Sequence, residues 1–399
     1  MKNPWRADFP QLKPGRTYLD SAAMSLKPQS VIDAVTGYYR DLSVNIHRSL
    51  YEESLTATNL YEAARREVAT LINADSDEIV FTRGATDALN LVASAYGKFL
   101  GPGDEIITSE LEHHSSYLPW RQVAEATGAS LRFIPLTETG RITLEGFISV
   151  LTAKTKVVAL THVSNVMGYL TPIQPIIDLA RSQGAITVID CAQSIYSEAL
   201  DVRMLGVDFL AFSGHKMLGP TGIGVLFGRR QLLNQLDPVA FGGDMNDFVT
   251  KTEVVWKDAP YRFEAGTMPV ASAIGLGEAV RYLKRVGLEA IDRHIKQLYR
   301  FTYAQLKKLE GLSIYNPDTD KGIITFNLTG VPSHDAVSYY AEQGVMLRSG
   351  HHCAQLVSGF LGIDSSLRAS FHLYSDYEDA DRFLQVTREA IAFFRKLGF

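Results

Sequence analysis

The chain has 399 residues, and its 39 Lys and Arg against 44 Asp and Glu give a net charge of −5 at pH 7. Its 46% hydrophobic and 21% charged residues exclude a disordered chain, and an acidic balance without a basic stripe argues against nucleic-acid binding. The N-terminus lacks a signal-peptide pattern and no segment approaches about 18 uninterrupted apolar residues, so we expect a cytoplasmic protein without membrane association. Only two cysteines occur, Cys191 and Cys353, which excludes a disulfide scaffold.

Short β-branched runs alternate with amphipathic helical stretches between residues 78 and 230. The runs lie at 78–82, 105–109, 131–135, 157–161, 186–190 and 209–213, with helical patterns such as 87–99 and 173–183 between them. Gly184 follows the second helical pattern, where a left-handed C-cap is expected. This alternation predicts an α/β fold with a mostly parallel central sheet covered by helices on both faces.

The pattern changes after residue 230. A stretch rich in Gly, Asp and aromatic residues at 241–260 precedes two long helical patterns, 270–286 and 288–309. The remainder predicts a smaller α+β layer, with strands at 312–315, 323–328, 345–348 and 367–371 and helices at 333–343 and 376–396. We therefore expect an N-terminal arm at 1–19 packing with the small domain, a large domain at 20–286 and a small domain at 287–399.

Two residues at strand ends suggest an active site at the carboxyl edge of the sheet, where open α/β sheets bind ligands. Lys216 follows the run 209–213 and is a candidate reactive amine, because a desolvated lysine forms Schiff bases readily. An ordinary surface lysine is the alternative. Asp190 ends an apolar strand, where a carboxylate needs a cationic partner such as a protonated pyridine nitrogen, unless it only caps the next helix.

Polar residues also follow other predicted strands. Thr86 lies in Thr-Arg-Gly-Ala-Thr-Asp, a turn that opens a helix and can hold a phosphate, although an ordinary βα turn is the alternative. His113 follows another strand end, where its imidazole could lie on a flat ring; a structural role is the alternative. Asn165 can donate to a ring oxygen or a substrate carboxylate, or cap its own turn.

The C-terminal region adds a candidate nucleophile. Cys353 stands in Arg348-Ser-Gly-His-His-Cys-Ala-Gln, with Arg368 downstream. Neighbouring histidines and arginine favour the thiolate, so Cys353 is the nucleophile candidate. Cys191 follows an apolar run and is expected to be a buried small residue.

Two other motifs, a dinucleotide-binding loop and a zinc site, do not match the sequence around them. The Gly-rich segment 219–224 precedes a strand pattern, whereas a dinucleotide-binding loop must open a helix. The paired histidines at 113–114 and 351–352 lack the ligand spacing of known zinc sites, so we predict no metal.

The order of these features resembles that of a known enzyme family. A phosphate-type turn, a strand-end histidine, Asp-x-x-Gln, Ser-x-His-Lys and the downstream Cys353 segment are similar to fold type I pyridoxal phosphate (PLP) enzymes of the class V aminotransferase family. The specific likeness is to the group II cysteine desulfurases that include SufS and CsdA. It runs nearly end to end, from Tyr18 to Phe371, and implies a large PLP-binding domain and a small domain carrying the catalytic cysteine.

The resemblance implies a role for each matching residue. Lys216 would carry the cofactor as a Schiff base, Asp190 would pair with its pyridinium nitrogen, and His113 would stack on its ring. Gln193 would donate to the ring hydroxyl. The phosphate would be held by Thr86, Ser213, His215 and, from the other subunit of a homodimer, Thr267. The substrate carboxylate would be bound by Asn165 and Arg368, with Arg348 nearby and with His47 and Arg48 at the active-site mouth across the dimer.

The reaction implied by the resemblance converts L-cysteine to L-alanine. Lys216 would move the Cα proton, and the Cys353 thiolate would take the sulfur as a persulfide. A sulfur-acceptor protein of the SufE, SufU or CsdE type is then expected, serving iron–sulfur cluster assembly or another thiolation pathway. L-selenocysteine and L-cysteine sulfinate are alternative substrates. A kynureninase-like hydrolase, an aminotransferase or a non-catalytic scaffold are alternative functions.

The chain departs from the family pattern at three positions. Leu356 stands where a proline usually follows Gln355, Met268 follows Thr267, and Cys191 stands where Gly or Ala is more usual. None of these departures removes an essential functional group.

Overall fold

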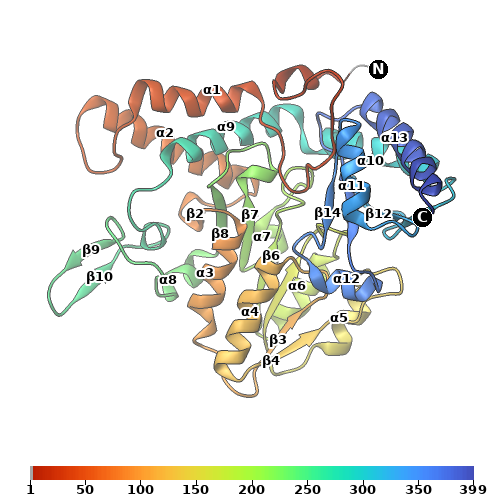
Figure 1. Cartoon of the computed structure of the whole chain (residues 1–399). Helices are drawn as coiled ribbons and strands as arrows, with labels where there is room; N and C mark the ends of the chain where they lie inside the picture. The colour runs from red at the N-terminus through yellow and green to blue at the C-terminus, as the bar shows by residue number, and fades with distance from the viewer. Residues whose placement is uncertain (1–2) are drawn as a thin grey trace.

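The computed structural model describes residues 3–399 and is organised around a seven-stranded sheet (Figure 1). The strand order is β2-β8-β7-β6-β5-β3-β4, and all neighbours are parallel except that β8 is antiparallel to β2 and β7. The strands are β2 (Ile79–Thr82), β3 (Glu105–Thr108), β4 (Ser130–Phe133), β5 (Thr155–Thr161), β6 (Ile186–Asp190), β7 (Phe209–Ser213) and β8 (Gly224–Gly228). The predicted mostly parallel sheet is therefore confirmed.

Helices cover both faces of this sheet. Along β5, Val157 and Ala159 enter one hydrophobic core while Val158 and Leu160 enter the other, because successive side chains of a strand point to opposite faces. The covering helices are α3 (Ala85–Gly97), α4 (His114–Thr127), α5 (Leu144–Val150), α6 (Ile173–Ser182), α7 (Val202–Leu205) and α8 (Arg230–Gln235). Gly184, just past α6, has φ +74°, as its predicted C-cap position requires. Within residues 3–399, no helix is both long and apolar enough to cross a bilayer.

The direction of strand order reverses between β3 and β5. From β3 the chain moves outward to β4, then returns to β5 on the other side of β3 and continues through β6 to β7. Ligands of open α/β sheets bind beyond the carboxyl ends of the strands at such a reversal. The topology therefore places a binding site beside the segments that follow β3, β5, β6 and β7.

A second sheet forms the smaller layer, which is blue in Figure 1. Its antiparallel order is β11-β12-β15-β14, with bounds β11 (Leu312–Ile314), β12 (Ile323–Leu328), β14 (Arg348–Gly350) and β15 (Ser366–Ser370). Its helices are α10 (Leu288–Leu306), α11 (Ser333–Glu342), α12 (Gln355–Leu361) and α13 (Tyr377–Lys396). The single strand expected at 345–348 is instead two short strands, because β13 (Val345–Met346) leaves this sheet to pair with β1 (Thr17–Tyr18).

Two further features complete the fold, and of their elements the sequence predicts only the helix at 270–286. Long helices α1 (Gln29–Gly37), α2 (Glu52–Leu71) and α9 (Val270–Val286) pack together along one side of the molecule (Figure 1). The segment 241–260 holds an antiparallel hairpin of β9 (Asn246–Val249) and β10 (Val254–Trp256), which projects from the body. One-turn segments complete the chain: Arg6–Asp8, Tyr38–Leu42, Ser76–Glu78, Gly214–Lys216 and Tyr261–Phe263.

Candidate active site

A cavity of about 170 Å³ lies where the carboxyl ends of the parallel strands meet the smaller layer. Most of the predicted site residues line it, namely Thr86, His113, Asn165, Asp190, Ser213, His215, Lys216, Arg348 and Arg368. Segments from seven strands contribute, because each of these residues ends a strand, follows one or lies within β14 or β15. The structure therefore gathers in one pocket residues that lie far apart in the sequence, from Thr86 to Arg368.

Lys216 and Asp190 form the charged centre of the pocket. Burial lowers the pKa of Lys216 to about 8, and the negative charge of Asp190 opposes part of that shift. Burial raises the pKa of Asp190, which is only 5% exposed, while Lys216 and the Ala192 N–H hold it down. A lysine whose pKa lies this low carries a sizeable fraction of neutral amine near neutral pH, as a nucleophilic amine must.

His113 is held by the first turn of α4. It is the N-cap of that helix, and its Nδ1 accepts from the Ser115 backbone N–H at 3.1 Å and lies 2.6 Å from the Ser115 hydroxyl. The Ser115 hydroxyl also lies 2.8 Å from the Thr86 hydroxyl. Burial, with help from the charge of Lys216, lowers the pKa of His113 to about 3. The ring is therefore neutral at physiological pH, which suits contact with a flat aromatic group.

The start of α3 supplies an anion-binding corner. Helix α3 begins at Ala85, directly after Gly84, and the Ala85 N–H donates to the Ser213 hydroxyl at 2.8 Å. His215 and Thr86 lie on the same wall of the cavity. A helix N-terminus with hydroxyl groups around it favours a phosphate, as the sequence predicts for this turn.

Asn165 and Arg368 are bound to each other and to the Cys353 loop. The Asn165 amide nitrogen donates to the His352 carbonyl at 2.8 Å, and the Asn165 carbonyl accepts from Arg368 Nη1 at 2.9 Å. Arg368 Nη2 also lies 3.3 Å from Asp20. Asn165 Oδ1 and Arg368 Nε are buried without a hydrogen-bond partner among residues 3–399, so both can still bind a ligand.

Cys353 lies exposed at the mouth of the pocket. Its Sγ is 3.6 Å from Nη2 of Arg348, which also lines the cavity. Both His352 and Cys353 have positive φ values, +53° and +56°, a conformation that non-glycine residues adopt rarely and that clusters at functional sites. The His114 N–H holds the loop by donating to the Cys353 carbonyl at 2.7 Å.

Gln193 lies next to the cavity without lining it. Its amide nitrogen donates to the Ala22 carbonyl at 2.7 Å, and its Oε1 is buried without a partner in the part of the chain that the structure describes. One of the two amide protons therefore remains available for the donor role that we predict.

Three predicted residues lie elsewhere in this chain. Thr267 and His47 line a separate cavity of about 300 Å³, and Arg48 forms an ion pair with Asp244 beside it. A single chain thus does not bring them to Lys216. Their placement at the site across a homodimer stays a prediction.

Sequence reasoning missed two polar residues of the pocket. Ser115 links His113 to Thr86, and buried His352 contributes Nδ1, which has no partner within residues 3–399. The position of Ser115 after a strand-end histidine was an available signal for its role. The burial of His352 depends on Ser366, whose hydroxyl lies 3.0 Å from its Nε2, and no local sequence pattern predicts that contact.

The fold and the donor set together fit the class of enzymes that use an aldehyde cofactor. The set fits pyridoxal phosphate: an amine for the aldehyde, a carboxylate for the ring nitrogen, and a helix start with hydroxyl groups for the phosphate. The unpartnered polar atoms of Asn165, Arg368 and His352 leave further positions for substrate groups.

Comparisons with known proteins agree with this definition. The class-V aminotransferase family model matches residues 17–383. A probable cysteine desulfurase of Halalkalibacterium halodurans is 46% identical over 366 residues, covering 91% of this chain and 90% of the relative. Two solved cysteine desulfurases are each 38% identical: CsdA of Escherichia coli (TM-score 0.92, covering 97% of this chain and 98% of CsdA) and the apo enzyme of Thermococcus onnurineus (TM-score 0.95, 98% and 99%).

The chain belongs to the class-V aminotransferase family and, within it, to the cysteine desulfurases. The resemblance seen in the sequence is confirmed, and so is the fold type I architecture. A further solved relative, C-DES, is 25% identical with a TM-score of 0.85 and holds glycine covalently linked to its PLP cofactor. The chain is a PLP-dependent enzyme.

Proposed function

We propose that the chain converts L-cysteine to L-alanine and carries the released sulfur as a persulfide on Cys353. One observation supports this most strongly. Arg348 lines the pocket of Lys216 and Asp190 and also contacts Cys353 Sγ at 3.6 Å, so the nucleophilic thiol stands at the mouth of the cofactor site. An aminotransferase would have no use for a thiol held there.

The residues of the large sheet would bind the cofactor. Lys216 would attach it, Asp190 would pair with its ring nitrogen, His113 would stack on its ring and Gln193 would donate to its hydroxyl. Thr86, Ser213 and His215, at the start of α3 and beside it, would hold its phosphate. Once bound, pyridoxal phosphate supplies an electron sink next to the substrate Cα.

The substrate would bind between the large sheet and the smaller layer. Arg368 is 1% exposed and lines the cavity, and its Nε has no partner among residues 3–399, so the guanidinium can still pair with the substrate carboxylate. Asn165 fixes both Arg368 and the Cys353 loop through its carbonyl and amide, so it aligns the carboxylate site with the nucleophile. Lys216, freed when the substrate amine binds, moves the Cα proton.

Cys353 would take the sulfur from the substrate by nucleophilic displacement at the sulfur atom. The thiolate forms an S–S bond with the substrate sulfur, the C–S bond breaks, and its electron pair passes to the carbon, which becomes the methyl group of L-alanine after protonation. Arg348 Nη2 lies 3.6 Å from the Cys353 sulfur and can donate a hydrogen bond to it. The product is a Cys353 persulfide.

An exposed persulfide requires a recipient. We propose a sulfur-acceptor protein with its own thiol, of the SufE, SufU or CsdE type, leading to iron–sulfur cluster assembly or another thiolation pathway, in a reducing cytoplasm that preserves the thiol.

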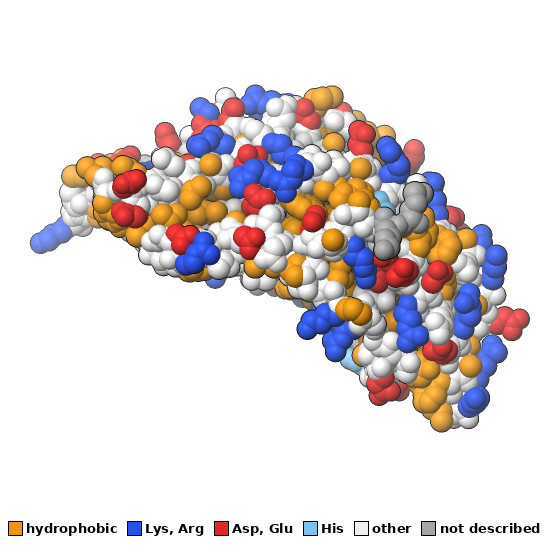
Figure 2. Space-filling model, turned by 90° about the horizontal axis from the view of Figure 1, so that it is seen from above, with side chains coloured by type: hydrophobic (Ala, Val, Ile, Leu, Met, Phe, Trp, Pro, Cys, Tyr) orange, Lys and Arg blue, Asp and Glu red, His pale blue; other side chains and the backbone are white. Residues whose placement is uncertain are grey.

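A homodimer would complete the site. Apolar side chains gather on the face shown in Figure 2, and large exposed ones occur from α1 to α2 and in the hairpin, including Tyr39, Leu50, Leu55, Phe248 and Val254. Contiguous apolar surface of this kind marks a protein interface. The cavity containing Thr267 and His47 lies near this surface and would face the partner's pocket.

The experiment that tests the function measures alanine formed from L-cysteine together with persulfide sulfur. With dithiothreitol present, the persulfide is reduced and its outer sulfur is released as sulfide, so wild-type protein should produce sulfide and alanine in equal amounts. Amino transfer to a keto acid, without alanine from cysteine, would show a different class V activity.

A further inference from the structure

The turn that carries Lys216 is bound by a buried serine that has no role in the reaction described above. The Ser25 hydroxyl donates to the His215 carbonyl at 3.0 Å and accepts from the Leu218 backbone N–H at 2.9 Å. The Ser25 backbone N–H donates to the same His215 carbonyl at 2.9 Å. Ser25 therefore binds the backbone on both sides of Lys216.

The Ser25 hydroxyl replaces a bond that the turn would otherwise make within itself. The His215 carbonyl and the Leu218 N–H are the two groups that bond directly when four residues close a β-turn. Within residues 215–218 the structure has no direct bond between them, and the Ser25 hydroxyl bridges them instead. Leu218 has φ +70°, a conformation that a non-glycine residue keeps only where neighbouring groups hold it. The backbone position of Lys216, between these two groups, therefore depends on Ser25.

A lysine from the same segment binds the turn as well. Lys27 Nζ donates to the His215 carbonyl at 3.2 Å and also to the Ser25 carbonyl. A charged donor makes a stronger hydrogen bond than a neutral one. Lys27 thus joins Ser25 to the residue that precedes Lys216.

The segment that contains Ser25 is anchored to the smaller layer through Tyr374. The Tyr374 hydroxyl accepts from the Leu26 backbone N–H at 3.1 Å and lies 2.8 Å from the Ser21 hydroxyl. One buried phenol group therefore holds residues on both sides of Ser25. Movement of Ser25 away from the Lys216 turn would break these contacts.

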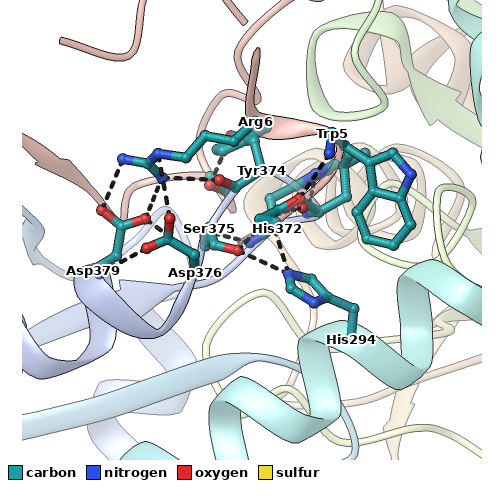
Figure 3. A network of polar contacts seen from close by, with 11 residues as sticks. Trp5, Arg6, His294, His372, Tyr374, Ser375, Asp376 and Asp379 are labelled. Carbon is teal, nitrogen blue, oxygen red and sulfur yellow. Dashed lines mark hydrogen bonds and ion pairs between the residues drawn. The ribbon is translucent and has the colours of Figure 1, made fainter. Parts of the chain in front are cut away.

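The N-terminal arm holds Tyr374 in turn (Figure 3). Asn3 donates to the carbonyls of Leu373 at 2.7 Å and Ser375 at 2.8 Å, and Arg6 donates to that of Tyr374 at 3.0 Å. Arg6 is itself paired with two carboxylates at the start of α13, those of Asp379 at 2.6 Å and Asp376 at 3.4 Å (Figure 3). A continuous set of hydrogen bonds thus runs from the arm through Tyr374 to Ser25.

We propose that Ser25 is a positioning residue for Lys216: its hydroxyl and N–H, held in place by Tyr374, fix the backbone on both sides of the lysine and keep the amine where cofactor attachment and proton transfer require it. The inference rests on the proposed role of Lys216. Small misplacements of a catalytic group lower the rate steeply, and Lys216 must serve two steps from one backbone position.

The first test compares Ser25→Ala with Ser25→Thr in the PLP-loaded enzyme. Alanine removes the bridging hydroxyl, whereas threonine retains it on the same Cβ. We expect Ser25→Ala to lower kcat about tenfold with KM for L-cysteine within about twofold, and Ser25→Thr to restore most of the rate. Exchange of the L-alanine Cα proton with D₂O, followed by NMR, should also fall about tenfold in Ser25→Ala, because it depends on Lys216 and not on Cys353.

Cofactor binding gives a second readout, which does not depend on turnover. PLP can bond to the Lys216 amine, whereas pyridoxamine phosphate has an amine in place of the aldehyde and binds through noncovalent contacts alone. In protein stripped of cofactor, Ser25→Ala should raise the Kd of PLP about tenfold and leave the Kd of pyridoxamine phosphate within about twofold of wild type, as measured by fluorescence titration. A general loss of structure in the pocket would weaken binding of both.

A matched control separates positioning from stability. Thr387 of α13 also has a buried hydroxyl with two contacts, since it donates to the Phe383 carbonyl at 2.7 Å and lies 3.0 Å from the Tyr340 hydroxyl. Thr387→Val should lower Tm without changing kcat, Cα exchange or the Kd of PLP.

Three results would overturn the inference. They are wild-type kcat and PLP affinity in Ser25→Ala, equal weakening of PLP and pyridoxamine phosphate binding, or a loss of rate that Ser25→Thr shares at unchanged Tm. Failure of the proposed function would instead show in wild-type protein as no alanine from L-cysteine, and the selective effect of Ser25→Ala on PLP binding would persist.

Discussion

Arg348 reaches from the pocket of Lys216 to Cys353, with its Nη2 lying 3.6 Å from the thiol sulfur. This contact joins two parts of the proposed reaction that lie on separate sheets, since Lys216 follows a strand of the large sheet and Cys353 follows β14 of the smaller one. The loop of Cys353 is also tied to the large sheet through Asn165 and His114. These contacts therefore hold the nucleophile at a fixed position relative to Lys216.

Replacement of Lys216 tests cofactor attachment. Lys216→Ala should abolish the absorbance of covalently held PLP and lower alanine formation by more than about 1,000-fold, because both the attachment point and the proton carrier are lost. Absorbance spectra and an alanine assay check this. Lys154→Ala, a change at an exposed surface lysine, should leave both unchanged. Normal turnover in Lys216→Ala would exclude its proposed role.

Asp190→Asn tests the partner of the ring nitrogen. Loss of the charge should lower kcat about 100-fold, because an amide cannot stabilise a protonated ring nitrogen as a carboxylate does. PLP should still bind, since Lys216 and the phosphate site remain. Steady-state kinetics and a spectral titration with PLP check both parts, with exposed Asp178→Asn as control. A variant that retains kcat would show that Asp190 serves only to cap its turn.

Arg368→Lys tests the carboxylate site. A lysine supplies one charge without the forked donors, so KM for L-cysteine should rise about 10- to 100-fold while kcat changes less. Burial lowers the pKa of Arg368 to about 10, so the native guanidinium stays charged at working pH. Arg300→Lys on the exposed face of α10 is the matched control. An unchanged KM would place the substrate carboxylate elsewhere.

The buried histidines predict loss of stability in mild acid. Burial lowers the pKa of His162 to about 3, so between pH 6.5 and 3 the unfolded chain binds a proton that the folded chain does not. Stability therefore falls as pH decreases through that window, and His162 alone accounts for about 2 kcal/mol between pH 7 and 5.

Urea unfolding at pH 7 and 5 measures this dependence. His162→Asn should reduce the loss on acidification by about that amount, whereas His334→Asn, at an exposed position, should not change it. Equal pH dependence in wild type and His162→Asn would mean that His162 is already protonated in the folded protein at pH 5.

The sequence predicts those site residues whose signal is local. Asp190 ends an apolar strand, Lys216 and Thr86 lie in the segments that follow one, and the order of the strands brings such positions to one edge of a sheet. The contact of Asn165 with His352 spans 187 positions, so no local pattern indicates that its amide holds the Cys353 loop. The same holds for the arm residues Asn3 and Arg6, whose partners lie near the other end of the chain.

Long-range contacts also explain why the sequence does not predict helix α2 or the division of the strand at 345–348. Helix α2 has seven buried residues among twenty, but Ser54 and Arg65 are among them, which weakens the apolar periodicity that marks a helix. Arg65 is buried because Glu264 pairs with it at 2.6 Å, a contact across 199 positions. The strand expected at 345–348 is divided because β1, a segment of two residues, pairs with its first half.

The most direct test of the account compares wild-type protein with Cys353→Ala, measuring alanine released from L-cysteine, L-selenocysteine and L-cysteine sulfinate under a reductant. We predict that Cys353→Ala retains the absorbance of bound PLP and loses turnover of L-cysteine, while the other two substrates, with better leaving groups, retain more of theirs. Undiminished alanine release from L-cysteine by Cys353→Ala would contradict the persulfide mechanism.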